Sequence, residues 1–160
     1  MRGALRARVA AGPTIAPAVP PADFDDFVEW LERVGAGLVL LDDRPLTELG
    51  PMLATVAPRV RAHVDAAEPA ILERAGREPS ESEATMLVAD HRWFEISLEQ
   101  LDWFYRIIER DDHGGHRQAL GQYVRLLAES LRRHRWRERA WYAGGPVAHR
   151  AAIAPSARKP

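Results

Sequence analysis

The sequence predicts an all-α protein, an up-down-up-down antiparallel four-helix bundle. Apolar residues recur every three or four positions through four segments between residues 22 and 142, which is the period of an amphipathic helix. Residues rich in Asp, Gly and Pro separate the segments near 42–45, 76–80 and 111–115. Connections this short join antiparallel neighbours, so the four segments are expected to form one bundle.

The first apolar stripe runs from Phe24 to Leu41, and the second runs from Leu46 to Ala70. The second stripe contains three prolines. Pro51 fits an opening turn, where a backbone N–H has no partner within the helix. Pro58 and Pro69 lie further inside and are expected to kink the helix or force a local irregularity.

The third stripe runs from Ala84 to Ile108, and the fourth from Leu120 to Trp141. Ser80 and Glu83 have the spacing of a capping box, in which each side chain bonds the backbone N–H of the other residue. The third helix is therefore predicted to begin just after Ser80.

Composition limits the organisation and the partners of the chain. Its 160 residues, 46% of them hydrophobic, suit one domain, expected at 22–142 between flexible tails at 1–21 and 143–160. A net charge of −1 gives no field that would favour nucleic acid, and no apolar run approaches the ~20 residues of a membrane span. We expect a cytoplasmic protein with neither nucleic acid nor membrane as partner. Without cysteine, a metal must bind to nitrogen and oxygen.

Three of the four apolar stripes include a histidine, at His63, His91 and His134. His91 lies 22 residues before His113 and His134 lies 21 after it, so a rise of ~1.5 Å per residue gives them nearly one height. His63 lies 15 residues before Glu78 and His91 lies 13 after it, a mismatch of only ~3 Å. The three imidazoles are therefore expected in one layer of the core.

Two glutamates accompany these histidines one helical turn further on. Glu138 follows His134 by four residues, and Glu95 follows His91 by four. A buried glutamate is costly unless it is paired or bound to a cation, and imidazole with carboxylate suits iron, manganese or zinc. The candidate metal ligands are His63, His91, Glu95, His134 and Glu138.

Two alternatives to this metal site remain open at the level of the sequence. The buried histidines and glutamates could form a hydrogen-bond network without metal. Glu95 flanks its stripe, and it could instead be a solvated residue paired with Arg92 or Arg106.

The order of these segments resembles the hemerythrin-like (HHE cation-binding) family over residues 22–142. "ALGQYVRLLAESLRRHRWRERAWY" resembles the family helix that carries His-x-x-x-Glu, and "LGPMLATVAPRVRAHVDAAEPAIL" looks like a second copy of it. "MLVADHRWFEISLEQL" is similar to the helix between them. The resemblance implies a four-helix bundle with a non-haem di-iron centre held by five histidines and two carboxylates.

The resemblance matches four residues to family ligands, namely His63, His91, His134 and Glu138. Two other positions depart from the pattern, because Ala67 stands where a carboxylate is usual and Glu95 where a histidine is usual. The first stripe has no histidine, and the height of His63 falls near Phe24 or Phe27. One metal on the remaining ligands, or a bundle that has lost its metal, therefore compete with the full di-iron centre.

The resemblance implies a non-haem metal protein, with iron as the expected ion and manganese or zinc as alternatives. It would sense or handle dioxygen, nitric oxide or iron, or oxidise a small substrate, with a diatomic or small-molecule ligand as partner. Whether it is an enzyme is left open. The alternative is a metal-free interaction module. Trp93 and Trp103, which lie off the apolar stripe, are candidates either for a homodimer contact or for covering the long second helix.

Overall fold

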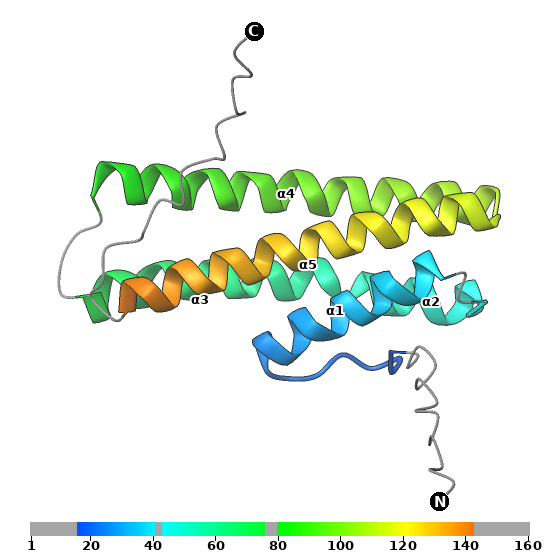
Figure 1. Ribbon diagram of the computed structural model, residues 1–160, viewed down its shortest axis with the longest axis horizontal. Helices are drawn as coiled ribbons and strands as arrows, with labels where there is room; N and C mark the ends of the chain where they lie inside the picture. Colours follow the sequence, from blue (N-terminus) through cyan, green and yellow to red (C-terminus); the bar gives the residue numbers. More distant parts are fainter. Residues whose placement is uncertain (1–15, 41–42, 76–79, 143–160) are drawn as a thin grey trace, which may run out of the picture.

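The computed structural model describes residues 16–40, 43–75 and 80–142, and all regular structure in these ranges is helical (Figure 1). The predicted all-α class is confirmed for this part of the chain. The expected tails fall outside it for residues 1–15 and 143–160. No helix in the described ranges is both long enough and apolar enough to cross a membrane. The helices are α1 (Phe24–Val39), α2 (Leu46–Ala54), α3 (Val56–Ala75), α4 (Glu81–Arg110) and α5 (Gly114–Tyr142).

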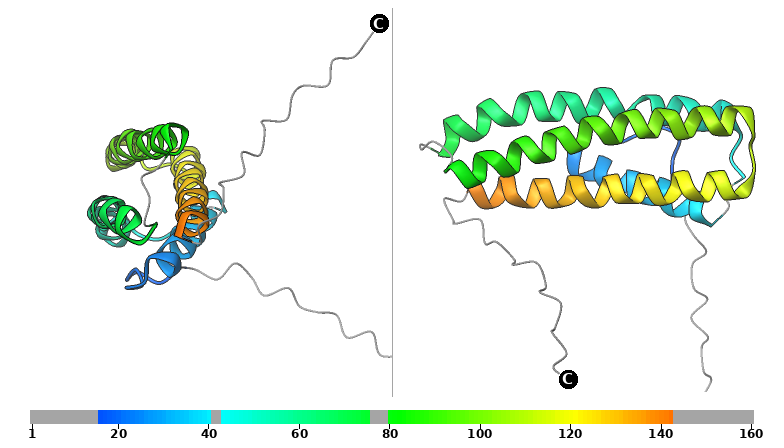
Figure 2. Two further views of the ribbon diagram at one scale, coloured as in Figure 1. Left: turned by 90° about the vertical axis from the view of Figure 1, so that its left-hand side faces the viewer. Right: turned by 90° about the horizontal axis from the view of Figure 1, so that it is seen from above.

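The three long helices α3, α4 and α5 lie side by side along the molecule (Figures 1 and 2). Helices α4 and α5 form an antiparallel hairpin through the turn at 111–113. The shorter α1 packs along one part of α5, which is its main neighbour. Helix α5 is therefore the central element, in contact with α1, α3 and α4.

The second apolar segment is interrupted close to one of its prolines, Pro58. Helix α2 ends at Ala54 and α3 begins at Val56, with Thr55 between them. Pro58 has no N–H to donate to the carbonyl of Ala54, so the break falls one turn before its ring. The irregularity expected at Pro69 does not interrupt the helix, because α3 continues to Ala75.

Side-chain caps set the starts of two helices. Asp23 accepts hydrogen bonds from the backbone N–H groups of Asp25 and Asp26 at 2.8 and 3.1 Å, which caps α1. At α4 the predicted capping box is confirmed. The backbone N–H of Ser80 donates to Glu83 Oε2 at 2.8 Å, and that of Glu83 donates to Ser80 Oγ at 3.3 Å.

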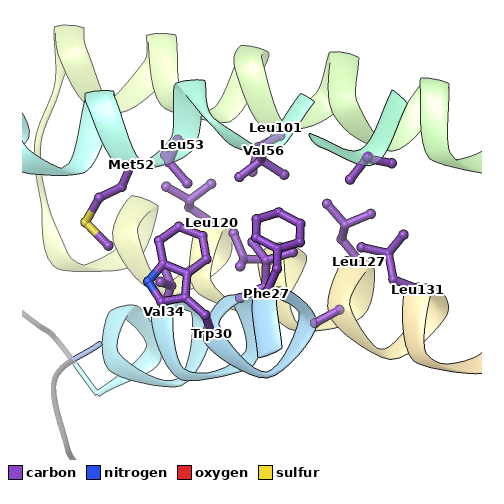
Figure 3. Packing of buried hydrophobic residues seen from close by; sticks show 14 of the residues in the cluster. Phe27, Trp30, Val34, Met52, Leu53, Val56, Leu101, Leu120, Leu127 and Leu131 are labelled. Carbon is purple, nitrogen blue, oxygen red and sulfur yellow. The ribbon is translucent and has the colours of Figure 1, made fainter. Parts of the chain in front are cut away.

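The apolar core is built mainly between α1 and α5, with α2, α3 and α4 covering it (Figure 3). Helices α1 and α5 cross at two glycines, and a Cβ added to Gly121 would lie 2.7 Å from the carbonyl oxygen of Gly35. The two backbones can approach this closely because both residues are glycines without a Cβ atom. The side chains around the crossing that are at most 2% exposed include Phe27, Trp30, Leu31, Leu38, Leu120, Val124 and Leu127.

The segment before α1 packs against the bundle from Ala16 onward. The indole N–H of Trp30 donates to the carbonyl of Pro17 at 2.7 Å, and the Arg44 guanidinium donates to that of Ala16 at 2.7 Å. Ala16 and Pro17, which lie in the tail expected at 1–21, thus accept hydrogen bonds from a buried indole and an arginine that the sequence pattern does not connect to them.

Candidate metal centre

Helix α5 supplies two polar side chains to its buried face. His134 and Glu138 continue the spacing of Leu127 and Leu131, so they point to the same side of the helix. Both side chains are 1% exposed. A histidine and a carboxylate thus occupy positions that apolar residues fill one and two turns earlier.

Helix α3 brings a third polar side chain to the same place. His63 follows Val56 and Val60 on the inner face of α3, and its Nε2 atom lies 3.3 Å from Glu138 Oε1. The Nε2 atom of His134 lies 3.3 Å from the same oxygen. The possible ligand atoms of His63, His134 and Glu138 all fall within 4.8 Å of one another.

These three atoms are buried, yet their mutual orientation does not satisfy them. Among the residues the structure describes, Nε2 of His63, Nε2 of His134 and Oε1 of Glu138 have no hydrogen-bond partner. Each histidine nitrogen lies 3.3 Å from Glu138 Oε1, but neither pair has the geometry of a hydrogen bond. Buried polar atoms are almost always paired, so three together require an explanation.

His91 lies next to this group on α4. Its ring centroid is 5.3 Å from that of His134, while the rings of His63 and His134 are 5.8 Å apart. The three imidazoles therefore lie together, in agreement with the heights counted from the turns. The Nε2 atom of His91 is also buried, but it is outside the compact group of three ligand atoms.

Glu95 is not brought to the site. Its side chain is 52% exposed and pairs with Arg61 of α3, with Nη2 and Oε2 2.8 Å apart. The pKa of Glu95 is lowered, chiefly by this hydrogen bond. Glu95 lies on the side of α4 that also bears the exposed Arg92 and Ile96. Glu95 is thus a solvated residue, but its partner is not the predicted Arg92 or Arg106.

Asp90 holds the outer nitrogen of His134, a contact that the sequence pattern did not predict. Its Oδ2 lies 3.0 Å from His134 Nδ1 and also accepts a hydrogen bond from Arg137. Burial alone would lower the pKa of His134, but the hydrogen bond with Asp90 and the nearby carboxylate of Glu138 outweigh it and raise the pKa. With its proton on Nδ1, a neutral His134 presents the lone pair of Nε2 to Glu138.

Arg135 holds the outer oxygen of Glu138. Its Nη1 donates to Glu138 Oε2 at 2.7 Å, and its Nε donates to Asp25 Oδ1 at 3.0 Å. Burial alone would raise the pKa of Glu138, but the contacts from His134, His63 and Arg135 outweigh it and hold the pKa far below its usual range. Glu138 is therefore an ionised, buried carboxylate with only Oε1 directed at the histidines.

Aromatic rings enclose the cluster. Phe24 of α1 stacks on His63, with ring centroids 3.7 Å apart and planes inclined by 14°. Phe94 of α4 meets His134 edge-on at 5.2 Å. The first-helix position at the height of His63 is thus filled by a phenyl ring that cannot bind metal. A small pocket between α4 and α5 reaches the other side of the cluster, and it is lined by Met86, Leu87, Asp90, His134, Arg137 and Glu138.

A second group of possible ligands lies in the turn between α4 and α5. His113 and His116 are there with Asp111, and all three are on the surface. His113 Nδ1 accepts from the N–H of Gly115 at 3.1 Å, and its ring stacks on that of His116 with centroids 3.6 Å apart. Stacked rings direct their in-plane lone pairs side by side rather than to one point. The contacts are those of a polar turn that starts a helix.

Comparison with known proteins finds no relative of this chain. No family model matches the sequence, and no curated protein and no solved structure matches it either.

Proposed function

We propose that this protein is a hemerythrin-like up-down-up-down four-helix bundle that binds a non-haem metal ion, with iron as the expected ion. The observation that carries the proposal is the cluster of three buried ligand atoms, from His63, His134 and Glu138, that face one another without hydrogen-bond partners. The resemblance of the sequence to the hemerythrin-like family, which rests partly on the same residues, points to the same assignment.

The residues present fit a metal ion. A tetrahedral ion with bonds of ~2.1 Å separates its ligand atoms by roughly 3.4 Å, close to the 3.3 Å between Glu138 Oε1 and each histidine nitrogen. Two imidazoles with one carboxylate suit iron, manganese or zinc. His91 is the next candidate ligand, because its buried Nε2 atom borders the group.

The surrounding side chains would assist the bound ion. Asp90 and Arg135 orient the two ligands of α5 through their outer atoms, as is usual around metal sites. Phe24 and Phe94 keep water from two sides of the cluster. When bound, iron would supply redox chemistry and open positions for dioxygen, nitric oxide or a small substrate. The small pocket beside Asp90 borders His134 and Glu138, on the side of the cluster towards α4.

A metal-free interaction module of the same fold is the second candidate. It is favoured by the charge balance, because Glu138 and Asp90 already meet Arg135 and Arg137. Each carboxylate thus has a cationic partner without a metal. In that case the buried network would serve the fold, and function would lie on the surface.

Metal content separates the two candidates. The full chain would be purified from iron-supplemented cells, analysed for iron, manganese and zinc, and then melted with and without each ion. We expect a bound transition metal and a higher Tm with that ion, because a ligand that binds only the native state stabilises it by about 4 kcal/mol at 1,000 times its Kd.

The variant His63→Ala/His134→Ala should lose both the metal and the increase in Tm. His116→Ala, a surface histidine outside the cluster, is the matched control and should retain both. Wild-type protein that stays metal-free after reconstitution with all three ions would refute the metal proposal. A partner retained by the double variant in a pull-down would then support the interaction module.

A further inference from the structure

The two oxygens of Glu138 have separate partners. Oε1 faces Nε2 of both His63 and His134 at 3.3 Å, whereas Oε2 accepts a hydrogen bond from Arg135 Nη1 at 2.7 Å. Both imidazoles thus converge on one oxygen. The other oxygen, which a bridging carboxylate would offer to a second metal ion, is occupied by a guanidinium.

Arg135 is fixed in this position from three sides. Its Nε donates to Asp25 Oδ1 at 3.0 Å, its Nη1 binds Glu138, and its guanidinium lies over the Phe24 ring at 6.0 Å. Its side chain is only 23% exposed, compared with 63% for Arg139. A permanent positive charge therefore stands between the carboxylates of Glu138 and Asp25, and it excludes a divalent cation by repulsion as well as by volume.

From these contacts we infer that the site holds one metal ion per chain and that Arg135 takes the place of a second cation on Glu138. This inference rests on the proposed function, because it assumes that His63, His134 and Glu138 bind an ion. It assigns Arg135 as a residue that limits the number of ions. Replacing Arg135 with a small neutral residue would free Glu138 Oε2 and Asp25 Oδ1, while Arg139 would still pair with Asp25 Oδ2. The two freed carboxylate oxygens could then bind a divalent ion.

The number of ions would be measured on the full chain by calorimetric titration with Co²⁺ and by elemental analysis after gel filtration. We expect one Co²⁺ in the wild type and two in Arg135→Ser. Adding Asp25→Asn to Arg135→Ser should return the number to one. Arg135→Lys, which keeps the positive charge, should remain at one.

The matched control is Arg132→Ser, which removes an exposed arginine of α5 that pairs with Glu129 and Glu32, and it should bind one Co²⁺. Circular dichroism would check that each variant folds, and the lysine variant keeps the test valid if Arg135→Ser does not. Two ions in the wild type or in the lysine variant, or a single ion in a folded Arg135→Ser, would overturn the inference alone. No ion in the wild type would instead refute the proposed function.

Discussion

Helix α5 has two halves that obtain their stability by different means. Around Gly121 its buried face is apolar and packs directly on α1 at the glycine crossing. Around His134 and Glu138 the same face is polar, and its side chains meet others from α1, α3 and α4. One helix therefore combines a region held by packing with a region held by charge.

The difference teaches where a function can be placed in such a small bundle. Burial of apolar side chains is favourable whether or not protons or a metal ion are bound. Burial of Glu138 and His134 costs several kcal/mol unless partners compensate, so this region is stable only while they do. The apolar region can thus support a polar region whose stability changes with protons or metal.

The largest effect is expected from breaking the apolar region with Gly121→Val. The new Cβ would lie 2.7 Å from the carbonyl oxygen of Gly35 and 2.8 Å from the backbone nitrogen of Val39, and backbone atoms of a packed helix cannot move aside easily. We expect a loss of about 3 kcal/mol in the free energy of unfolding, measured with urea. Gln122→Val, at the exposed neighbouring position, is the control. An unchanged unfolding midpoint for Gly121→Val would show that α1 does not cross α5 at this point.

A smaller effect is expected in the polar region of the metal-free protein from Glu138→Gln. Because the pKa of Glu138 is lowered from 4.5, the carboxylate stabilises the fold fully above pH 4.5, and this contribution is lost as the pH falls towards the folded-state pKa. We expect the variant to lose about 2 kcal/mol near pH 6. Its unfolding free energy should also decline less steeply in acid than that of the wild type.

His134 gives the opposite pH dependence. Its pKa is raised above 6.5, so its contribution is complete below pH 6.5 and is lost as the pH rises through the folded-state pKa. The free energy of unfolding in urea, measured from pH 3 to pH 9, would test the loss of stability in acid and the loss of stability at high pH together. Glu129→Gln, at an exposed position of α5, should leave both unchanged, and an equally steep acid limb in Glu138→Gln would contradict the assignment.

Asp90→Asn should weaken metal binding without removing a ligand. The substitution takes away the charged acceptor of His134 Nδ1–H, which fixes the nitrogen that faces the cluster. Loss of such a partner lowers metal affinity about 10- to 100-fold. The Kd for Co²⁺ would be compared with that of Asp102→Asn, which removes an exposed carboxylate of α4 paired with Arg106. Equal Kd values for the two variants would mean that Asp90 does not position His134.

The smallest effect is expected from Glu95→Gln. This change removes an ion pair with Arg61 in which both side chains are about half exposed, and such pairs contribute less than ~1 kcal/mol. Unfolding in urea should shift by less than ~0.5 kcal/mol, and the Kd for Co²⁺ should not change. A tenfold weaker Kd would restore Glu95 to the ligand set that the sequence predicted.

The residues that the sequence predicted correctly share one property, which is that they depend on distances along the chain. The capping box at Ser80 needs only a spacing of three residues. The missing N–H of a proline is also a local property, and it correctly predicted the irregularity before Pro58, although Pro69 does not interrupt α3. The common height of the three histidines follows from the rise of a helix and the positions of the turns.

The residues that the sequence missed depend on how each helix is rotated about its own axis. Glu95 and Glu138 have the same four-residue relation to a histidine, yet one is exposed and the other is buried. Asp90 is off the apolar stripe of α4, and Arg135 is one of five arginines in its segment, so no period distinguishes either from a solvated residue.

The sequence by itself determined the helices, most of their limits and the layer in which the histidines lie, because periodicity and rise are local properties of the chain. Only the tertiary structure decided which atoms of that layer meet. In the folded protein one oxygen of Glu138 faces the histidines and the other accepts a hydrogen bond from Arg135. Asp90 contacts the outer nitrogen of His134, and Phe24 stacks on His63. These contacts join four helices, and the rotation and separation of helices are set by the packing of the whole core.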